Sequence, residues 1–107
     1  MDEQMLESMT AEIVDELHPD TIILFGSHAR GNAGQHSDVD LLVIVPDSEE
    51  ALRHRRQIEG RLYRRLARYP VSKDVLVFTR EEIHRWKAVR GHIIESSLRE
   101  GRQLYAG

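Results

Sequence analysis

Two apolar segments joined by a short polar loop constrain the fold of this chain more than any other feature. Residues 21–25, TIILF, are apolar and rich in β-branched side chains, which predicts a buried strand. Residues 38–45, DVDLLVIV, predict a second strand that ends before Pro46. The loop from 28 to 37 is too short to contain the helix that joins parallel strands. We therefore expect the two strands to pair in the antiparallel direction.

The rest of the chain alternates between helical and strand patterns. Residues 2–17 repeat apolar side chains at the spacing that the buried face of an amphipathic helix requires. The other expected elements are a helix over 48–69, a strand over 73–79, a helix over 80–89, a helix over 92–100 and a short sheet segment at Leu104–Tyr105. This order predicts an α/β fold in which helices flank a small mixed β-sheet.

Composition narrows the classes of function. The 107 residues fit one domain over 1–107, and a formal net charge of -3 does not favour generic nucleic-acid binding. The chain has no cysteine, which excludes disulfides and thiolate metal ligands. The first residues, MDEQMLESM, lack the apolar core of a signal peptide, and no apolar run is long enough to span a membrane. We expect a cytoplasmic protein without a membrane partner.

Three aspartates are candidates for a metal site. Asp38 and Asp40 alternate at the start of the second strand, so their side chains share one face. Two adjacent anions repel each other unless a cation lies between them, and Mg²⁺ prefers carboxylate oxygens together with substrate phosphates. Asp74 could bring a third carboxylate to the same end of the sheet, whereas its rival Asp47 lies beyond the far end of the strand. Three carboxylates can hold the two ions that assist an in-line phosphoryl displacement.

The turn after the first strand is a candidate phosphate site. Gly26 allows a phosphate to approach the backbone, and Ser27 adds a hydroxyl donor at the start of a helical turn that Gly31 ends. Arg30 is placed to contact a phosphate or to brace the acidic loop. A lone Gly-Ser or Asp-x-Asp is usually an ordinary turn or a solvated strand end. The combination of both with a later aspartate on a strand is what points to a phosphate and metal site.

The run GSHARG followed by SDVDLLV resembles the signature of the nucleotidyltransferase superfamily that shares the DNA polymerase β palm fold. The spacing between the serine and the first aspartate matches its small branch, the minimal nucleotidyltransferase (MNT) domains. The resemblance implies a polymerase β-like nucleotidyltransferase fold in which Gly26 and Ser27 hold the nucleoside triphosphate. It further implies that Asp38, Asp40 and Asp74 bind two Mg²⁺ ions and form the catalytic centre.

Domains of this size resemble the antitoxin of HEPN–MNT toxin–antitoxin modules, whose HEPN partner is a helical RNase. The resemblance implies transfer of AMP from ATP to a tyrosine of that toxin, which neutralises it. One alternative is an antitoxin that acts by contact alone. Another is a nucleotidyltransferase subunit that acts on a small molecule or an RNA.

The arginine-dense segment 53–68 bears on these alternatives. Such a run is most simply a solvated helix face, but it could also be a docking surface for an acidic partner or an RNA. Glu59 could pair with Arg55 or Arg56, which weakens the nucleic-acid interpretation. His28 and His36 flank the candidate site and could touch a phosphate.

Overall fold

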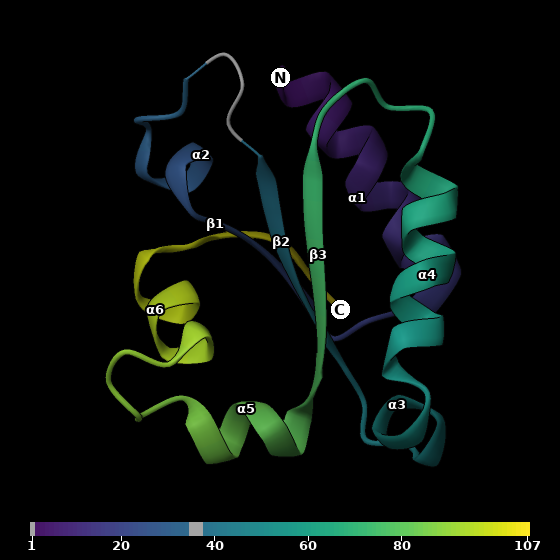
Figure 1. Ribbon diagram of the computed structural model, residues 1–107, viewed down its shortest axis with the longest axis vertical. Helices are drawn as coiled ribbons and strands as arrows, with labels where there is room; N and C mark the ends of the chain where they lie inside the picture. Colours follow the sequence, from purple (N-terminus) through teal and green to yellow (C-terminus); the bar gives the residue numbers. More distant parts are fainter. Residues whose placement is uncertain (1, 35–37) are drawn as a thin grey trace.

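The computed structural model of the chain describes residues 2–34 and 38–107. His36, which the sequence places beside the candidate site, lies outside the described residues. The elements in chain order (Figure 1) are α1 (Glu3–Leu17), β1 (Thr21–Phe25), α2 (Ser27–Arg30), β2 (Val39–Val45), α3 (Glu49–Arg53), α4 (Arg55–Leu66), β3 (Lys73–Thr79), α5 (Arg80–Trp86), α6 (Ile93–Glu100) and β4 (Arg102–Ala106).

The four strands form one mixed sheet in the order β3-β2-β1-β4. Strand β1 is antiparallel to β2 and to β4, while β2 is parallel to β3. The predicted α/β fold and the predicted antiparallel pair are therefore confirmed. The segment at Leu104–Tyr105 does join the sheet, as part of edge strand β4. The crossover between the parallel strands β2 and β3 contains α3 and α4, as parallel pairing requires.

The two faces of the sheet pack against different helices. Helices α1 and α4 cover one face, and α2, α5 and α6 lie on the other (Figure 1). Alternation along β2 separates the faces, because Val39, Leu41 and Val43 join the cluster of α1 and α4, whereas Leu42 and Ile44 join the smaller opposite cluster. The side chains of Asp38 and Asp40 share the parity of the opposite cluster. In the described ranges, no helix has both the length and the apolar character needed to cross a bilayer.

The prediction of one helix over 48–69 is wrong. Helix α3 begins after Ser48, whose hydroxyl accepts the N–H of Ala51 at 3.0 Å, and the chain leaves helical geometry at His54. A second helix, α4, starts at Arg55 and ends at Leu66. No glycine or proline marks this break. It coincides with a tertiary contact, in which Arg55 forms an ion pair with Glu82 at 2.5 Å. The helix predicted over 80–89 also ends earlier, at Trp86.

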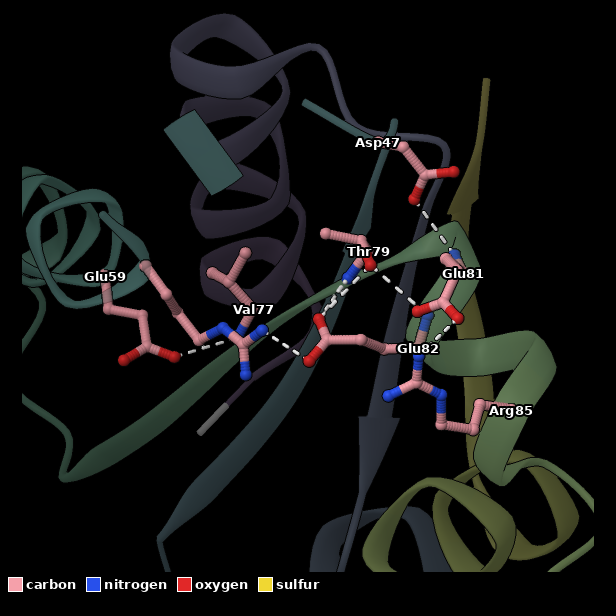
Figure 2. A network of polar contacts seen from close by, with 8 residues as sticks. Asp47, Glu59, Val77, Thr79, Glu81, Glu82 and Arg85 are labelled. Atoms are coloured by element: carbon pink, nitrogen blue, oxygen red, sulfur yellow. Dashed lines mark hydrogen bonds and ion pairs between the residues drawn. The ribbon is translucent and has the colours of Figure 1, made fainter. Parts of the chain in front are cut away.

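Strand β3 lies at an edge of the sheet, and its outer N–H groups are bonded by side chains. The acceptors are Tyr63 Oη for Val75 at 2.8 Å, Glu59 Oε2 for Val77 at 3.0 Å and Glu82 Oε1 for Thr79 at 2.9 Å. Figure 2 shows the bonds of Glu59 to Val77 and of Glu82 to Thr79. These side chains occupy the donors that another strand would use, so they protect the edge from unwanted pairing.

Glu82 connects three elements at this edge. Its carboxylate accepts the Thr79 N–H, closes the capping box that starts α5, and pairs with Arg55 of α4. Burial opposes ionisation of Glu82, but the bonds from Arg55 and Thr79 outweigh it and hold its pKa below the usual value. Ionised Glu82 therefore stabilises the folded chain.

The arginine-dense segment contributes mainly to contacts within the chain. Five of its seven arginines pair with acidic residues: Arg53 with Glu49, Arg55 with Glu82, Arg61 with Glu50, Arg65 with Glu12, and Arg68 with Glu12. The pairs with Glu12 join α4 to α1. Glu59 bonds to β3 and, in the part of the chain that the structure describes, forms no ion pair with Arg55 or Arg56. Most of this positive charge is therefore balanced internally.

Replacement of Glu82 tests how much its contacts with Thr79 and Arg55 stabilise the edge of β3. We expect Glu82→Ala to lower the free energy of unfolding by about 1–3 kcal/mol, because it leaves a backbone N–H and a half-buried arginine without their acceptor. Urea unfolding at pH 7 measures the change. The pKa of Glu82 is lower in the folded chain than in the unfolded chain, so its stabilising effect is present above the unfolded pKa and is lost as pH falls. The difference in unfolding free energy between the wild type and Glu82→Ala should therefore shrink below about pH 4.

Glu81→Ala is the matched control. Glu81 is more exposed than Glu82, and its carboxylate forms an ion pair with Arg85, one turn further along the same helix (Figure 2). Such a pair contributes less than about 0.5 kcal/mol. Equal losses in the two variants would show that Glu82 does not anchor the edge.

Candidate functional site

The pairing of β2 with β3 brings two of the predicted ligands together. Asp40 and Asp74 are register partners in adjacent parallel strands, whose backbones lie about 4.8 Å apart. Their following partners, Leu42 and Leu76, pack in one cluster, so the two carboxylates project from the same face. Asp38 directly precedes β2. All three predicted carboxylates thus lie at the end of the sheet where β2 and β3 begin.

The environment of Asp40 disfavours its negative charge. Its side chain is half-buried, whereas Asp38 and Asp74 are exposed. Burial raises the pKa of Asp40, and the negative charges of Asp74 and Asp38 raise it further, against the smaller opposite effects of His28 and Arg30. The carboxylates of Asp74 and Asp38 are therefore close enough to Asp40 to disfavour its negative charge. A cation beside Asp40 would relieve both the repulsion and the desolvation.

The donor chemistry fits a divalent cation of the Mg²⁺ class, because carboxylate oxygens are its preferred protein ligands. In ranges 2–34 and 38–107, however, no three His, Asp or Glu side chains are grouped closely enough to hold one ion together. At Asp74, Oδ1 accepts a hydrogen bond from Tyr63 Oη at 3.1 Å. The metal role of Asp38, Asp40 and Asp74 therefore stays a prediction that the shared face and the mutual repulsion support.

Gly26 joins the predicted phosphate turn to the carboxylates. It precedes α2 with φ 75° and ψ −156°, a combination that only glycine adopts readily. A β-carbon at this position would overlap the Oδ2 atom of Asp40. The register agrees, because Phe25, the residue before Gly26, is the partner of Asp40 across the β1–β2 pair. The turn and the Asp-x-Asp pair therefore form one continuous site.

The structure places the other predicted residues around this turn. Ser27 begins α2, and the helical turn ends at Gly31 in the left-handed conformation, as the sequence predicts. Arg30 pairs with Glu100 of α6 at 3.5 Å and also acts electrostatically on Asp40. Asp47 lies at the opposite end of β2, where its Oδ1 accepts the N–H of Glu81 at 3.0 Å (Figure 2). Asp47 is thus a structural residue of the α5 start and lies outside the site.

Tyr63 is the residue of this region that sequence reasoning missed. No motif in the sequence points to it, yet its hydroxyl contacts both Asp74 and the backbone of Val75. Partial burial raises the pKa of Tyr63, and the charges of Asp74 and Glu59 act in the same direction. No local pattern reveals the contact, because α4 and β3 meet only in the folded chain.

Substitution of Gly26 tests the continuity of the site. We expect Gly26→Ala to destabilise the fold by about 2–3 kcal/mol, since both its backbone conformation and the nearby Asp40 carboxylate oppose a β-carbon. The control Gly31→Ala meets no atom within 4 Å and should lose only about 1 kcal/mol. Urea unfolding of both variants, and of Gly26→Ala in an Asp40→Ala background, measures these costs. A Gly26→Ala penalty that stays the same without the Asp40 carboxylate would contradict the packing argument.

We expect ionised Asp40 to lower the free energy of unfolding of the chain. The pKa of Asp40 is higher in the folded chain than in the unfolded chain, so its protonated form favours folding below the unfolded pKa and this effect is lost as pH rises. At pH 7 the ionised Asp40 carboxylate is therefore unfavourable to the fold. We expect Asp40→Asn to raise the thermal midpoint of the metal-free protein at pH 7, with the gain vanishing near pH 3. Asp47→Asn, which keeps an acceptor for the Glu81 N–H, should leave the midpoint nearly unchanged. A lower midpoint for Asp40→Asn would refute the repulsion.

Comparison with known proteins identifies a family model and two relatives that match this chain. The sequence profile of the nucleotidyltransferase domain matches residues 7–102. Two proteins of Methanocaldococcus jannaschii, whose names describe them as inferred protein adenylyltransferases, are similar to the chain. MJ1305 is 35% identical over 83 residues, which are 72% of this chain and 48% of that protein. MJ0141 is 36% identical over 58 residues, which are 54% of each. The chain thus spans about half the length of these relatives.

Solved structures share the arrangement of strands and helices. A protein of Sulfolobus solfataricus, described as an inferred nucleotidyltransferase, aligns with a TM-score of 0.62 at 17% identity, covering 96% of this chain and 78% of that one. A toxin–antitoxin structure with AMP-PNP aligns with a TM-score of 0.57 at 19% identity, covering 94% of this chain and 73% of that one. These likenesses concern the fold. The profile match covers nearly the whole chain and includes every predicted site residue, and it shows that the chain belongs to the nucleotidyltransferase domain family.

Proposed function

We propose that the chain is a Mg²⁺-dependent adenylyltransferase that moves AMP from ATP to a tyrosine of a partner protein. The observation that carries the proposal is the contact between Gly26 and Asp40, with Asp74 in register on the next strand. It joins a turn suited to phosphates with carboxylates suited to metal ions. The relatives whose names include protein adenylyltransferase support a protein acceptor.

Each group has a defined task in this reaction. Asp38, Asp40 and Asp74 would hold two divalent cations, which supply charge neutralisation to the triphosphate and to the leaving group. Gly26 and Ser27 would hold the phosphates through the backbone of the turn.

Arg30 would complete the phosphate contacts. Its ion pair with Glu100 is long and largely exposed, so the guanidinium can exchange that partner for a phosphate at small cost.

The chemical step is an in-line displacement at the α-phosphorus of ATP. The tyrosine oxygen forms a bond to this phosphorus as the bond to the bridging oxygen of the β-phosphate breaks. AMP remains on the tyrosine, pyrophosphate leaves, and the phenolic proton passes to water. The protein contributes position and electrostatics more than covalent chemistry.

The proposed partner is a toxin of the HEPN RNase class, which AMP transfer would neutralise. The motif GSHARG with SDVDLLV resembles MNT antitoxins, and one structural neighbour is a toxin–antitoxin structure with AMP-PNP. The cytoplasm is the proposed location because it supplies both ATP and Mg²⁺. Nucleic acid is not the expected acceptor, since the formal net charge is -3 and most arginines of segment 53–68 are paired within the chain.

Intact-mass spectrometry tests the proposal. The chain is incubated with the product of the adjacent gene, ATP and Mg²⁺, and the partner should gain the mass of one or more adenylyl groups. Asp38→Ala with Asp40→Ala should reduce the rate by at least about 10³-fold, because the cation that neutralises the transferred phosphate loses its ligands. Asp47→Asn, at the far end of β2, should retain the wild-type rate.

Two outcomes would contradict adenylyl transfer to a protein. If the partner gains no mass while the double aspartate variant still inhibits the toxin, the chain acts by contact alone. If labelled nucleotide appears on an RNA or a small molecule and on no protein, the acceptor class is wrong.

A further inference from the structure

Tyr63 reaches the site from the opposite side of the sheet. Its neighbours Leu62 and Leu66 on α4 are fully buried in the cluster that α4 forms with α1, on the face away from the three carboxylates. Tyr63 is 37% exposed, and its side chain extends to the outer edge of β3. There its hydroxyl meets the Val75 N–H at 2.8 Å and Asp74 Oδ1 at 3.1 Å.

The direction of these two hydrogen bonds follows from the groups themselves. A backbone N–H can only donate, so the Tyr63 oxygen accepts from Val75. The phenol has one proton, and an ionised carboxylate can only accept, so that proton goes to Asp74 Oδ1. The hydroxyl is thereby fixed by the backbone of β3 on one side and engages one oxygen of Asp74 on the other. Tyr63 engages the carboxylate through Oδ1, and Asp74 lies on the face that it shares with Asp40.

Asp74 needs such support more than Asp40 does. Asp40 is half-buried and lies against the Gly26 turn, whereas Asp74 is exposed on an edge strand. An exposed side chain loses rotational freedom when it becomes a ligand, and a hydrogen bond that already orients it reduces this cost. Partners that orient metal-bound carboxylates in this way typically change metal affinity by about 10–100-fold.

We propose that Tyr63 is a positioning residue for the third carboxylate. Its hydroxyl holds Asp74 Oδ1 at the edge of β3 and so increases the affinity of the site for a nucleotide-bound divalent cation. This inference rests on the metal and nucleotide site of the proposed function. The same hydroxyl also bonds an edge N–H, so a test must separate orientation of Asp74 from protection of the strand.

Calorimetric titration with Mn²⁺ and AMP-PNP, which require no chemical turnover, measures this effect. Tyr63→Phe should bind Mn²⁺·AMP-PNP about 10-fold more weakly than the wild type. Tyr105→Phe is the matched control, because it removes a phenolic hydroxyl from β4, at the opposite edge of the sheet. It should bind as the wild type does. Urea unfolding of each variant verifies that the fold is intact.

A double-mutant cycle with Asp74→Asn separates the two roles of the hydroxyl. If Tyr63 acts through the Asp74 carboxylate, Tyr63→Phe should weaken binding no further in the Asp74→Asn background. If it acts through the strand edge, the two losses should add, which would overturn the proposal.

Unchanged or tighter binding by the single Tyr63→Phe variant would also overturn it, while the proposed function would stand. If the wild type itself does not bind Mn²⁺·AMP-PNP, the proposed function fails, and this inference fails with it.

Discussion

The pairing of β2 on both of its edges is the constraint on which the site depends. The antiparallel register with β1 places Phe25 opposite Asp40, so that the turn at Gly26 starts beside that carboxylate. The parallel register with β3 places Asp74 on the other side. A slip of β2 by one residue would exchange its two faces and put Asp40 into the apolar cluster of α1 and α4. The free energy of the core therefore also fixes the geometry of the carboxylates.

The same arrangement has an energetic cost at the site. Asp40 is partly desolvated, and the carboxylates of Asp74 and Asp38 at the same end of the sheet repel its charge. Below the site, β2 continues through Leu41, Leu42 and Val43, which are almost completely buried, and both neighbouring strands add apolar contacts. The apolar half of β2 can therefore hold the charged half in an unfavourable position. This division allows one short strand to carry both buried core residues and the candidate ligands.

The sequence was sufficient for the strands and for the positions of the three aspartates along them, because both depend on local pattern. Strand 73–79 was predicted with the observed bounds, and alternation within it places Asp74 on one face with Leu76 and Phe78. The break at His54 could not be predicted, since no glycine or proline marks it and the contact of Arg55 with Glu82 forms only in the folded chain. Tyr63 was missed for the same reason, because its partners belong to another element.

Edge protection and site geometry share one set of side chains on β3. Its outer N–H groups recur at every second residue, and α4 and α5 supply an acceptor for each of Val75, Val77 and Thr79. The acceptor for the first of these groups necessarily lies beside Asp74, because the two residues are adjacent in the strand. If a carboxylate accepted the Val75 N–H, as Glu59 accepts that of Val77, it would add another negative charge next to Asp74. A phenol can accept from the backbone and still donate to the carboxylate, which is the combination that this end of the strand requires.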